Sequence, residues 1–167
     1  FFKQKTAYEI PKRDWSSDVC SSDLFIIWTF ILYWIHRLGH IIPIVSRIHN
    51  DHHKFIAGNP PPSWHWSNLL LFNDTWLSTV DLWITEVIPT FLLSWMLGWW
   101  WLIVFYYFWA AFIQENIEHN PKFDYFPWLP SGAWHLLHHK NSKINFGSFT
   151  IIWDYLFRTK SDCFRTQ

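Results

Sequence analysis

Two copies of the pattern H-x-x-H-H constrain this sequence more than any other feature. One copy spans residues 49–53 and the other residues 135–139, and His36 and His40 form an H-x-x-x-H pair just upstream. On a helix, residues three and four positions apart share a face, so each of these histidine boxes projects two or three imidazoles toward one point. The boxes hold eight of the ten histidines: His36, His40, His49, His52, His53, His135, His138 and His139.

The composition places this clustering in a chain that is unusually apolar. The 167 residues suffice for one domain, with 50% hydrophobic, 22% aromatic and 16% charged residues. A typical soluble domain carries about 25% charged residues, so the excess apolar surface indicates a membrane protein. The formal net charge is zero, and no basic patch with interleaved aromatics indicates nucleic-acid binding.

Residues 1–24 differ from the rest of the chain because they are polar and follow no helical or strand period. Back-translation of two stretches within them matches a standard sequencing-library adapter and its index. We therefore expect residues 1–24 to be an adapter-derived artefact outside any domain, which leaves the natural chain truncated at its N-terminus, and the alternative is a disordered natural tail. A membrane domain is expected at residues 25–160 and a C-terminal tail at residues 161–167.

The first apolar segment runs without a break from Phe25 to Ile35 and leads directly into the first box. It is shorter than the about 20 residues that a membrane crossing needs, so it is expected to be the end of a truncated transmembrane helix. Pro43 is expected to break or bend this helix. A new helical segment over residues 47–54 then carries the second box.

The second apolar segment, residues 69–113, contains Asp74, Asp81 and Glu86 as its only charges. A metal site shared by all boxes requires them on one side of the membrane, so this segment must cross an even number of times. Its length predicts a helical hairpin with a turn near Gly98.

Lysine and arginine residues flank the box-bearing segments and are absent from the predicted hairpin tip, residues 97–101, so the boxes are expected to face the cytoplasm. The predicted fold is an all-α integral membrane protein. It consists of a truncated transmembrane helix and a helical hairpin, with a cytoplasmic-side helical cap that carries the histidine boxes.

The histidine clustering favours a site with two metal ions. Imidazole nitrogen suits iron, zinc, copper or nickel, and eight histidines are too many for one tetrahedral zinc. No box contains the glutamate of H-E-x-x-H, which disfavours a zinc protease, and no glycine-rich phosphate loop or G-x-S-x-G motif is present. An all-nitrogen, redox-capable pair beside the hydrocarbon region suits the activation of dioxygen and the removal of hydrogen from an unactivated C–H bond of a lipid.

Four motifs resemble those of the fatty acid hydroxylase / sterol desaturase superfamily: Tyr33–His40, Arg47–His53, Trp134–His139 with Asn145-Phe-Gly147, and Trp153–Phe157. The resemblance covers the chain from Phe25 to about Thr159. The resemblance implies an integral-membrane, non-haem di-iron oxygenase of lipid biosynthesis. Such an enzyme hydroxylates or desaturates a sterol, fatty acyl or carotenoid-type lipid with dioxygen and external electrons. The ligands that it implies are His36, His40, His49, His52, His53, His119, His135, His138 and His139.

Two further residues near the boxes have open roles. Glu115 stands where some family members have a histidine, so it is a candidate carboxylate ligand, a partner of a ligand, or neither. His65 lies between Trp64 and Trp66 with no histidine at helical spacing. We expect it to be an interfacial residue, with contact to metal or substrate as the alternative.

The resemblance also implies partners and a location. Because the sequence shows no electron-donor domain, a separate ferredoxin or cytochrome b5-type donor with its reductase is expected. The membrane is the bacterial inner membrane or the endoplasmic reticulum. The alternatives are a membrane metal-binding or transport protein, which should carry its ligands near mid-membrane, and a non-functional fragment.

Overall fold

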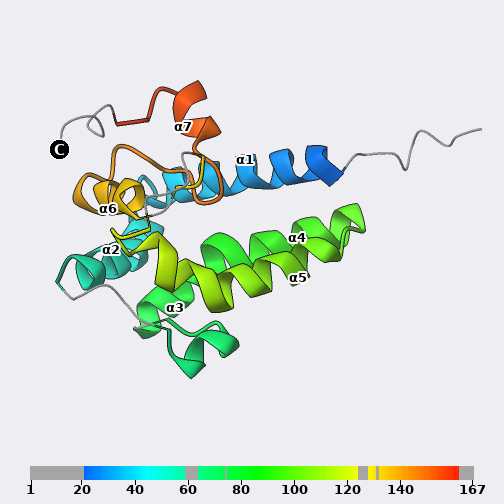
Figure 1. Ribbon diagram of the computed structural model, residues 1–167, viewed down its shortest axis with the longest axis horizontal. Coiled ribbons are helices and arrows are strands. Elements are labelled where there is room, and N and C mark those ends of the chain that lie inside the picture. Colours follow the sequence, from blue (N-terminus) through cyan, green and yellow to red (C-terminus); the bar gives the residue numbers. More distant parts are fainter. Residues whose placement is uncertain (1–20, 59–63, 74, 124–127, 131, 162–167) are drawn as a thin grey trace, which may run out of the picture.

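The computed structural model describes residues 21–58, 64–73, 75–123, 128–130 and 132–161. Every regular element in these ranges is helical, which confirms the all-α prediction (Figure 1). Residues 1–20 of the predicted adapter-derived segment 1–24, the proline-rich residues 59–63 and the end of the predicted tail lie outside these ranges. In chain order the elements are α1 (Ser21–Gly39), α2 (Pro43–Gly58), the 3₁₀-helix η1 (Trp66–Leu70), α3 (Trp76–Leu82), the π-helix η2 (Trp83–Val87), α4 (Ile88–Leu97), α5 (Trp101–Phe108), the π-helix η3 (Trp109–Glu118), α6 (Ala133–Lys140) and α7 (Ile152–Leu156).

Helices α1 and α2 meet at a sharp bend, as predicted from Pro43. Their axes differ by 95°, and Pro43 is the first residue of α2. A proline suits this position because the first helical N–H has no partner within the helix. α2 therefore begins at Pro43 rather than at Arg47, and α1 begins at Ser21 rather than at Phe25.

The predicted hairpin is present, with its turn at Gly98. Helices α3, η2 and α4 form one continuous span, Trp76–Leu97, of 22 residues with a mean hydropathy of 1.4. This is the one straight helix in the described ranges that is long and apolar enough to cross a membrane, and the bent α1–α2 pair would be a second span. Gly98 ends α4 with φ +66°, a left-handed conformation that glycine adopts readily.

The two arms of the hairpin differ in length. The first arm begins at Trp76 rather than at Leu69, because η1 and a short loop come before it. The apolar part of the returning arm, Trp101–Gln114, falls short of the length of a full crossing, because polar residues occupy the rest of η3.

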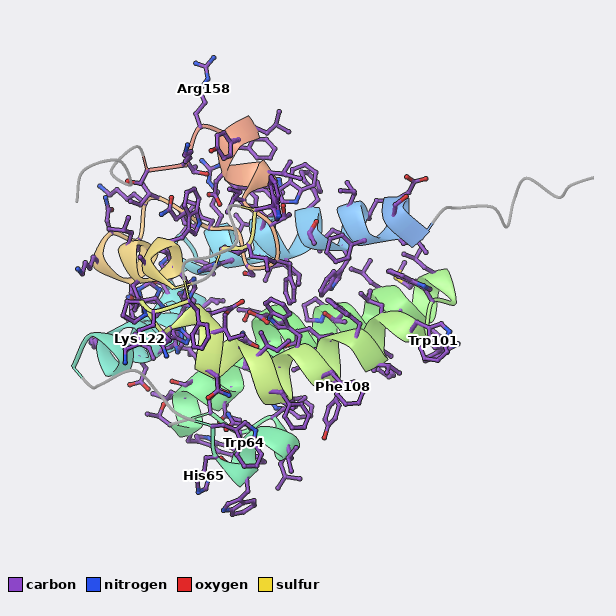
Figure 2. All side chains as sticks on the ribbon, in the orientation of Figure 1. Trp64, His65, Trp101, Phe108, Lys122 and Arg158 are labelled. Atoms are coloured by element: carbon purple, nitrogen blue, oxygen red, sulfur yellow. The ribbon has the colours of Figure 1, made fainter. Side chains whose placement is uncertain are left out.

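The hairpin runs alongside α1, while α2 and α6 gather at the opposite end from the hairpin tip (Figure 1). A buried aromatic and aliphatic cluster joins these helices and includes Trp28 and Leu32 of α1, Leu102 and Tyr106 of α5, and Phe149. Figure 2 shows Trp101 at the hairpin tip and Lys122 near α2. The fold therefore separates an apolar end from the polar end that carries the histidines.

Candidate metal centre

All nine predicted site histidines lie together at the polar end of the fold. They form two groups in which the candidate ligand atoms lie within 4.8 Å of one another. The first group consists of His36, His40, His49, His53 and His138, and the second of His52, His119, His135 and His139. The structure thus brings the residues together as expected, and their role as metal ligands stays a prediction.

Each H-x-x-H-H box supplies both groups. In the α2 box, His49 and His53 belong to the first group and His52 to the second. The α6 box reverses this pattern, because the pair at spacing four, residues 135 and 139, joins the second group while His138 joins the first. The last two histidines of each box are adjacent in the chain and therefore lie about 100° apart around the helix axis, so one box can serve two neighbouring points.

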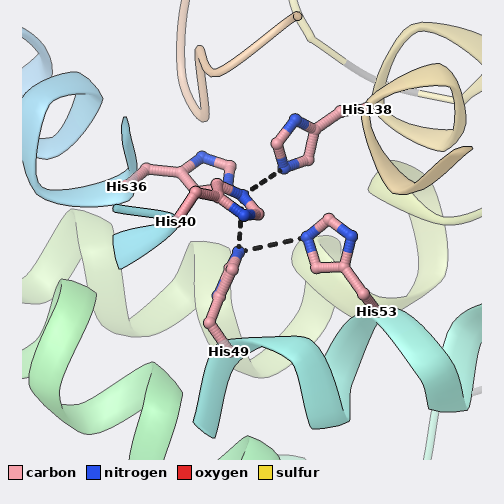
Figure 3. Close-up of side chains that lie close together, drawn as sticks. All are labelled: His36, His40, His49, His53 and His138. Carbon is pink, nitrogen blue, oxygen red and sulfur yellow. Dashed lines mark hydrogen bonds between the residues drawn. The ribbon is translucent and has the colours of Figure 1, made fainter. Parts of the chain in front are cut away.

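The first group is held together by close approaches between Nε2 atoms (Figure 3). The Nε2 of His40 lies 3.0 Å from that of His138 and 3.1 Å from that of His49. The Nε2 of His53 lies 3.1 Å from that of His49. These atoms come from α2, α6 and the segment after α1, so the group joins three parts of the chain.

Hydrogen bonds at Nδ1 fix the tautomers of three of these rings. The Nδ1–H of His49 donates to Oδ2 of Asp81 (2.7 Å), and that of His36 donates to the carbonyl of Phe146 (2.8 Å). The Nδ1–H of His138 donates in the same way to the carbonyl of residue 144 (2.7 Å). A neutral imidazole has one N–H, so the Nε2 atoms of all three rings are bare lone pairs.

This donor set fits a metal ion. Three bare Nε2 lone pairs converge, and the buried Nε2 of His36 has no hydrogen-bond partner among the described residues. Two nitrogens bound at about 2.1 Å and at right angles to one another are about 3.0 Å apart, which matches the separations here. Five nitrogens exceed a tetrahedral zinc shell and suit a metal with a larger coordination number.

The second group has the same chemistry and lies beside the first. The Nε2 atoms of His135 and His139 are 3.0 Å apart, and the ring of His119 has its centroid 4.9 Å from that of His135. The rings of His53 and His139 stack with centroids 4.2 Å apart, so the two groups are in direct contact. This arrangement supports two adjacent metal ions.

Electrostatics keep the α6 histidines in the form that binds metals. Burial lowers the pKa of His135, His138 and His139 well below the ordinary value of 6.5, and the neighbouring imidazoles lower it further. The low dielectric of the interior disfavours the charged imidazolium. These rings are therefore neutral at physiological pH and offer a free lone pair.

The Asn145-Phe-Gly147 motif shapes the loop that supports the first group. Asn145 has φ +57°, a left-handed conformation that asparagine tolerates, and its side-chain Nδ2 donates to the carbonyl of Trp134 (3.1 Å). The backbone N–H groups of Phe146 and Gly147 both donate to the carboxylate of Asp154 at 2.8 Å. These two hydrogen bonds to Asp154 position the Phe146 carbonyl, which accepts a hydrogen bond from the Nδ1–H of His36.

The Asp154 carboxylate is itself enclosed. Burial raises its pKa, although the hydrogen bonds from Thr159 and from the two backbone N–H groups oppose this rise. Thr159 Oγ1 lies 2.7 Å from Asp154 Oδ1 and 2.9 Å from the hydroxyl of Tyr33 on α1. The contribution of the Trp153–Phe157 motif is therefore Asp154, whose hydrogen bonds connect α7 to the loop at residues 145–147, which supports the first histidine group.

Sequence reasoning missed the role of Asp81. From the sequence, Asp81 was noted only as one of the charges of an apolar segment. In the structure its carboxylate accepts a hydrogen bond from His49, 32 residues away in the chain. The sequence did offer a signal for this role, namely an aspartate in an otherwise apolar helix. An ionisable residue in a membrane helix has a high free-energy cost and therefore indicates a functional contact.

His65 and Glu115 have different outcomes. His65 caps η1 by accepting a hydrogen bond from the N–H of Ser67, and Figure 2 shows it far from α6. The prediction that it lies outside the metal centre is consistent with this position. The side chain of Glu115 lies outside the described part of the structure, so its role stays open.

A cavity of about 40 Å³ adjoins both groups. Its lining includes histidines of each group, Asn73 from the loop before the hairpin, and polar residues of the hairpin itself: Asp81, Thr85, Glu86, Gln114 and Glu118. Space beside a metal centre is what a reacting molecule needs, and this space is bordered by the membrane-facing arms of the fold.

Several curated proteins are similar to this chain in sequence. Three similar proteins are a Delta(7)-sterol 5(6)-desaturase of Aspergillus fumigatus, a methylsterol monooxygenase of Arabidopsis thaliana and a very-long-chain aldehyde decarbonylase of Oryza sativa. Their identities to this chain are 32%, 30% and 29%, over 80%, 81% and 81% of its length. The chain spans 35% of the first relative and 44% of the other two.

No solved structure gives a significant match. The sequence model of the fatty acid hydroxylase family matches residues 23–159, which include every histidine of both groups. Because this match covers most of the chain, the protein belongs to the fatty acid hydroxylase family.

Proposed function

We propose that this chain is a membrane-bound non-haem di-iron oxygenase that hydroxylates or desaturates a lipid in lipid biosynthesis. The observation that carries this proposal is the pair of adjacent all-histidine groups, in the first of which three Nε2 lone pairs are directed inward. The relatives named for sterol desaturation and methylsterol oxygenation support an oxidation of a lipid.

Iron suits this site better than zinc. Imidazole binds either metal, but a shell of five nitrogens suits a larger coordination number, and zinc has no redox chemistry. Bound here, two iron ions would supply the electrons that reduce dioxygen and the oxidising power that breaks an unactivated C–H bond. The first ion would be held by His36, His40, His49, His53 and His138, and the second by His52, His119, His135 and His139.

The chain's own residues orient the ligands and exclude competing protons. Asp81 and the carbonyls of residues 144 and 146 hold three rings in one tautomer, so no proton blocks their Nε2 atoms. Burial keeps the α6 rings neutral. The ligand set is therefore preorganised, which lowers the reorganisation that accompanies a reaction.

The overall stoichiometry requires partners. Hydroxylation consumes dioxygen, two electrons and two protons, places one oxygen atom in the C–H bond and releases one water. Desaturation consumes the same reagents, removes two hydrogen atoms from the lipid and releases two waters. The electrons come from a separate donor of ferredoxin or cytochrome b5 type with its reductase.

The lipid reaches the centre from the bilayer, and the histidine end faces the cytoplasm. The exposed apolar side chains of the hairpin, among them Trp95, Met96 and Trp101, suit contact with lipid. Lys122, Lys140 and Lys143 are exposed at the histidine end, as the positive-inside rule expects. The membrane is the bacterial inner membrane or the endoplasmic reticulum.

The test combines metal analysis with lipid profiling. Cells expressing the chain with a supplied electron donor should accumulate an oxygen-dependent lipid product, and the purified protein should contain two irons per chain. The variant His138→Gln should lose both the product and iron, whereas His65→Gln, which alters a histidine outside the two groups, should keep both. Wild-type protein that binds no iron and forms no product would refute the proposal.

A further inference from the structure

One wall of the cavity is polar but holds no histidine. Gln114 Nε2 donates to both carboxylate oxygens of Glu86, at 3.2 and 3.1 Å. The hydroxyl of Tyr106 donates to Oε2 of the same carboxylate at 3.1 Å from within the buried core cluster. Glu86 and Gln114 both line the cavity, so this hydrogen-bonded set fixes a carboxylate at its edge.

The π-helices explain how these residues reach the cavity. In a straight α-helix, residues five positions apart differ by about 140° around the axis, which would turn Glu86 away from Asp81. The wider turn of η2 (Trp83–Val87) brings both residues to the cavity. Such π-turns occur often at functional sites.

Glu86 lies where an ionisable group is expensive. It and Asp81 are the only charged residues of the membrane-length helix Trp76–Leu97. Such residues mark functional sites by default. Asp81 supports His49, whereas Glu86 accepts hydrogen bonds from Gln114 and Tyr106, so its position at the cavity suits a different role.

The same cavity contains a second sign of a missing ligand. Asp81 is only 6% exposed, and its Oδ1 is buried without a hydrogen-bond partner among the described residues. A buried acceptor in this state calls for a donor from outside the protein. The wall therefore offers acceptors and needs an occupant with an O–H or N–H group.

The size and charge of the cavity select among possible occupants. A volume of about 40 Å³ holds a hydroxyl group with the few atoms next to it, but not a whole hydrocarbon chain. The carboxylates of Asp81, Glu86 and Glu118 line it and repel an anionic head group such as a carboxylate or phosphate. The remaining match is a hydrogen-bond donor without negative charge at the polar end of a lipid, and the test below separates an alcohol from an amine.

We propose that Glu86, held by Gln114 and Tyr106, binds the hydroxyl group of a neutral lipid alcohol. This assignment rests on the proposed function and narrows its substrate class. Glu86 and the histidines line one small cavity, so the oxidised C–H bond lies within a few bonds of that hydroxyl. Glu86 is then a specificity-determining residue, which accepts the O–H of the alcohol and rejects an ether that has no donor.

The test measures lipid binding directly on the purified chain in phosphatidylcholine nanodiscs. A diazirine-bearing hexadecanol and a diazirine-bearing 3-hydroxysterol serve as photolabels, and labelled peptides are mapped by mass spectrometry. Each label is competed with its unlabelled alcohol and the methyl ether of that alcohol. For the hexadecanol label, hexadecanoate and hexadecylamine are also used as competitors.

In the wild-type protein, the alcohol of at least one skeleton should compete at least about tenfold better than its ether, since a hydrogen bond to a charged acceptor is among the strong ones. Glu86→Gln should reduce this preference to about threefold or less. Tyr107→Phe, which removes a hydroxyl that bonds to the carbonyl of Leu69 outside the cavity, should leave it unchanged. If Glu86→Gln fails to fold by circular dichroism, Gln114→Met tests the same wall and should also weaken the preference.

Three results would overturn the assignment. They are equal competition by alcohol and ether in both skeletons, tighter binding of the acid or the amine, and an alcohol preference that survives Glu86→Gln. Iron content and oxygen-dependent product are read on the same preparation. A product without an alcohol preference removes this inference alone, whereas an alcohol preference without iron or product removes the proposed function and leaves the alcohol site.

Discussion

Replacing Asp81 with asparagine should weaken metal binding in the first histidine group and spare the second. Asp81 contacts His49 through a 2.7 Å hydrogen bond, and both side chains are 8% exposed. A carboxylate partner of this kind fixes the ring orientation and raises the basicity of the ligating nitrogen. Asparagine keeps the size and one acceptor oxygen but removes the charge.

The magnitude follows from the loss of that charge. A hydrogen bond to a charged group contributes about 1.5–3 kcal/mol, and a neutral one about 1 kcal/mol. The difference of about 0.5–2 kcal/mol corresponds to about a 2- to 30-fold loss of metal affinity. Partners of metal-ligating histidines in other proteins have effects of about 10- to 100-fold, which overlaps this range.

The assay is a chelator competition followed by metal analysis of the purified chain. At a chelator concentration where the wild-type protein keeps two ions, Asp81→Asn should keep about one. The matched control is Asp51→Asn, which removes a carboxylate from α2 that accepts from Thr75 rather than from a histidine. The control should keep both ions, and circular dichroism should show that both variants remain folded.

Two outcomes would refute this reasoning. Retention of both ions at wild-type affinity would mean that the Asp81–His49 contact does not support a ligand. Parallel loss of both ions would mean that the nine histidines form one unit rather than two groups, since Asp81 contacts the first group alone among the described hydrogen bonds.

Three further predictions concern single residues and pH. Gly147→Ala should destabilise the fold by more than about 1 kcal/mol in thermal unfolding, because a Cβ there would lie 2.8 Å from Asp154 Oδ2 and closer still to the Thr150 carbonyl. The control Gly39→Ala should be tolerated, because its Cβ would lie 3.7 Å from the Val45 side chain. His65→Ala should leave metal content unchanged, and a loss of iron would place it in the centre. The free energy of unfolding of the metal-free protein should fall as pH drops below about 6.5 and stay flat above about pH 7, because the α6 histidines take up protons in the unfolded chain but not in the fold, where their pKa is lowered. Each histidine that stays neutral in the fold contributes about 1.4 kcal/mol per pH unit. A flat profile down to about pH 5 in denaturant titrations would contradict this prediction.

The fold could be predicted where a local pattern determines the structure. Pro43 and Gly98 mark the bend and the hairpin turn because one lacks an N–H and the other adopts a positive φ freely. The clustering of the histidines followed from helical spacing together with the need for one shared side. The bend, the turn and the shared face within each box are read from residues within a few positions of one another, whereas the hairpin followed from the requirement that all the boxes share one side.

The features that could not be predicted from the sequence depend on contacts between elements that are far apart in the chain. The division of each box between two groups depends on how α2 and α6 face each other, which no spacing within one box encodes. Asp81 meets His49 only after the hairpin packs beside α2. The π-turns that direct Glu86 and Gln114 into the cavity are also invisible, since no residue pattern separates them from an ordinary apolar helix.

The reversed division of the two boxes has a mechanical consequence for the centre. α2 places two histidines in the first group and one in the second, and α6 does the opposite. Neither group can therefore assemble from one helix, and each ion would bind α2 to α6. The first group adds α1 through His36, and the second adds the end of η3 through His119. A pair of ions would thus cross-link α1, α2, α6 and the hairpin at one end of the fold, so metal binding would stabilise the docking of these elements. The polar end would then gain rigidity from its metals, while the buried aromatic cluster around Trp28 and Tyr106 holds α1 to the hairpin without them.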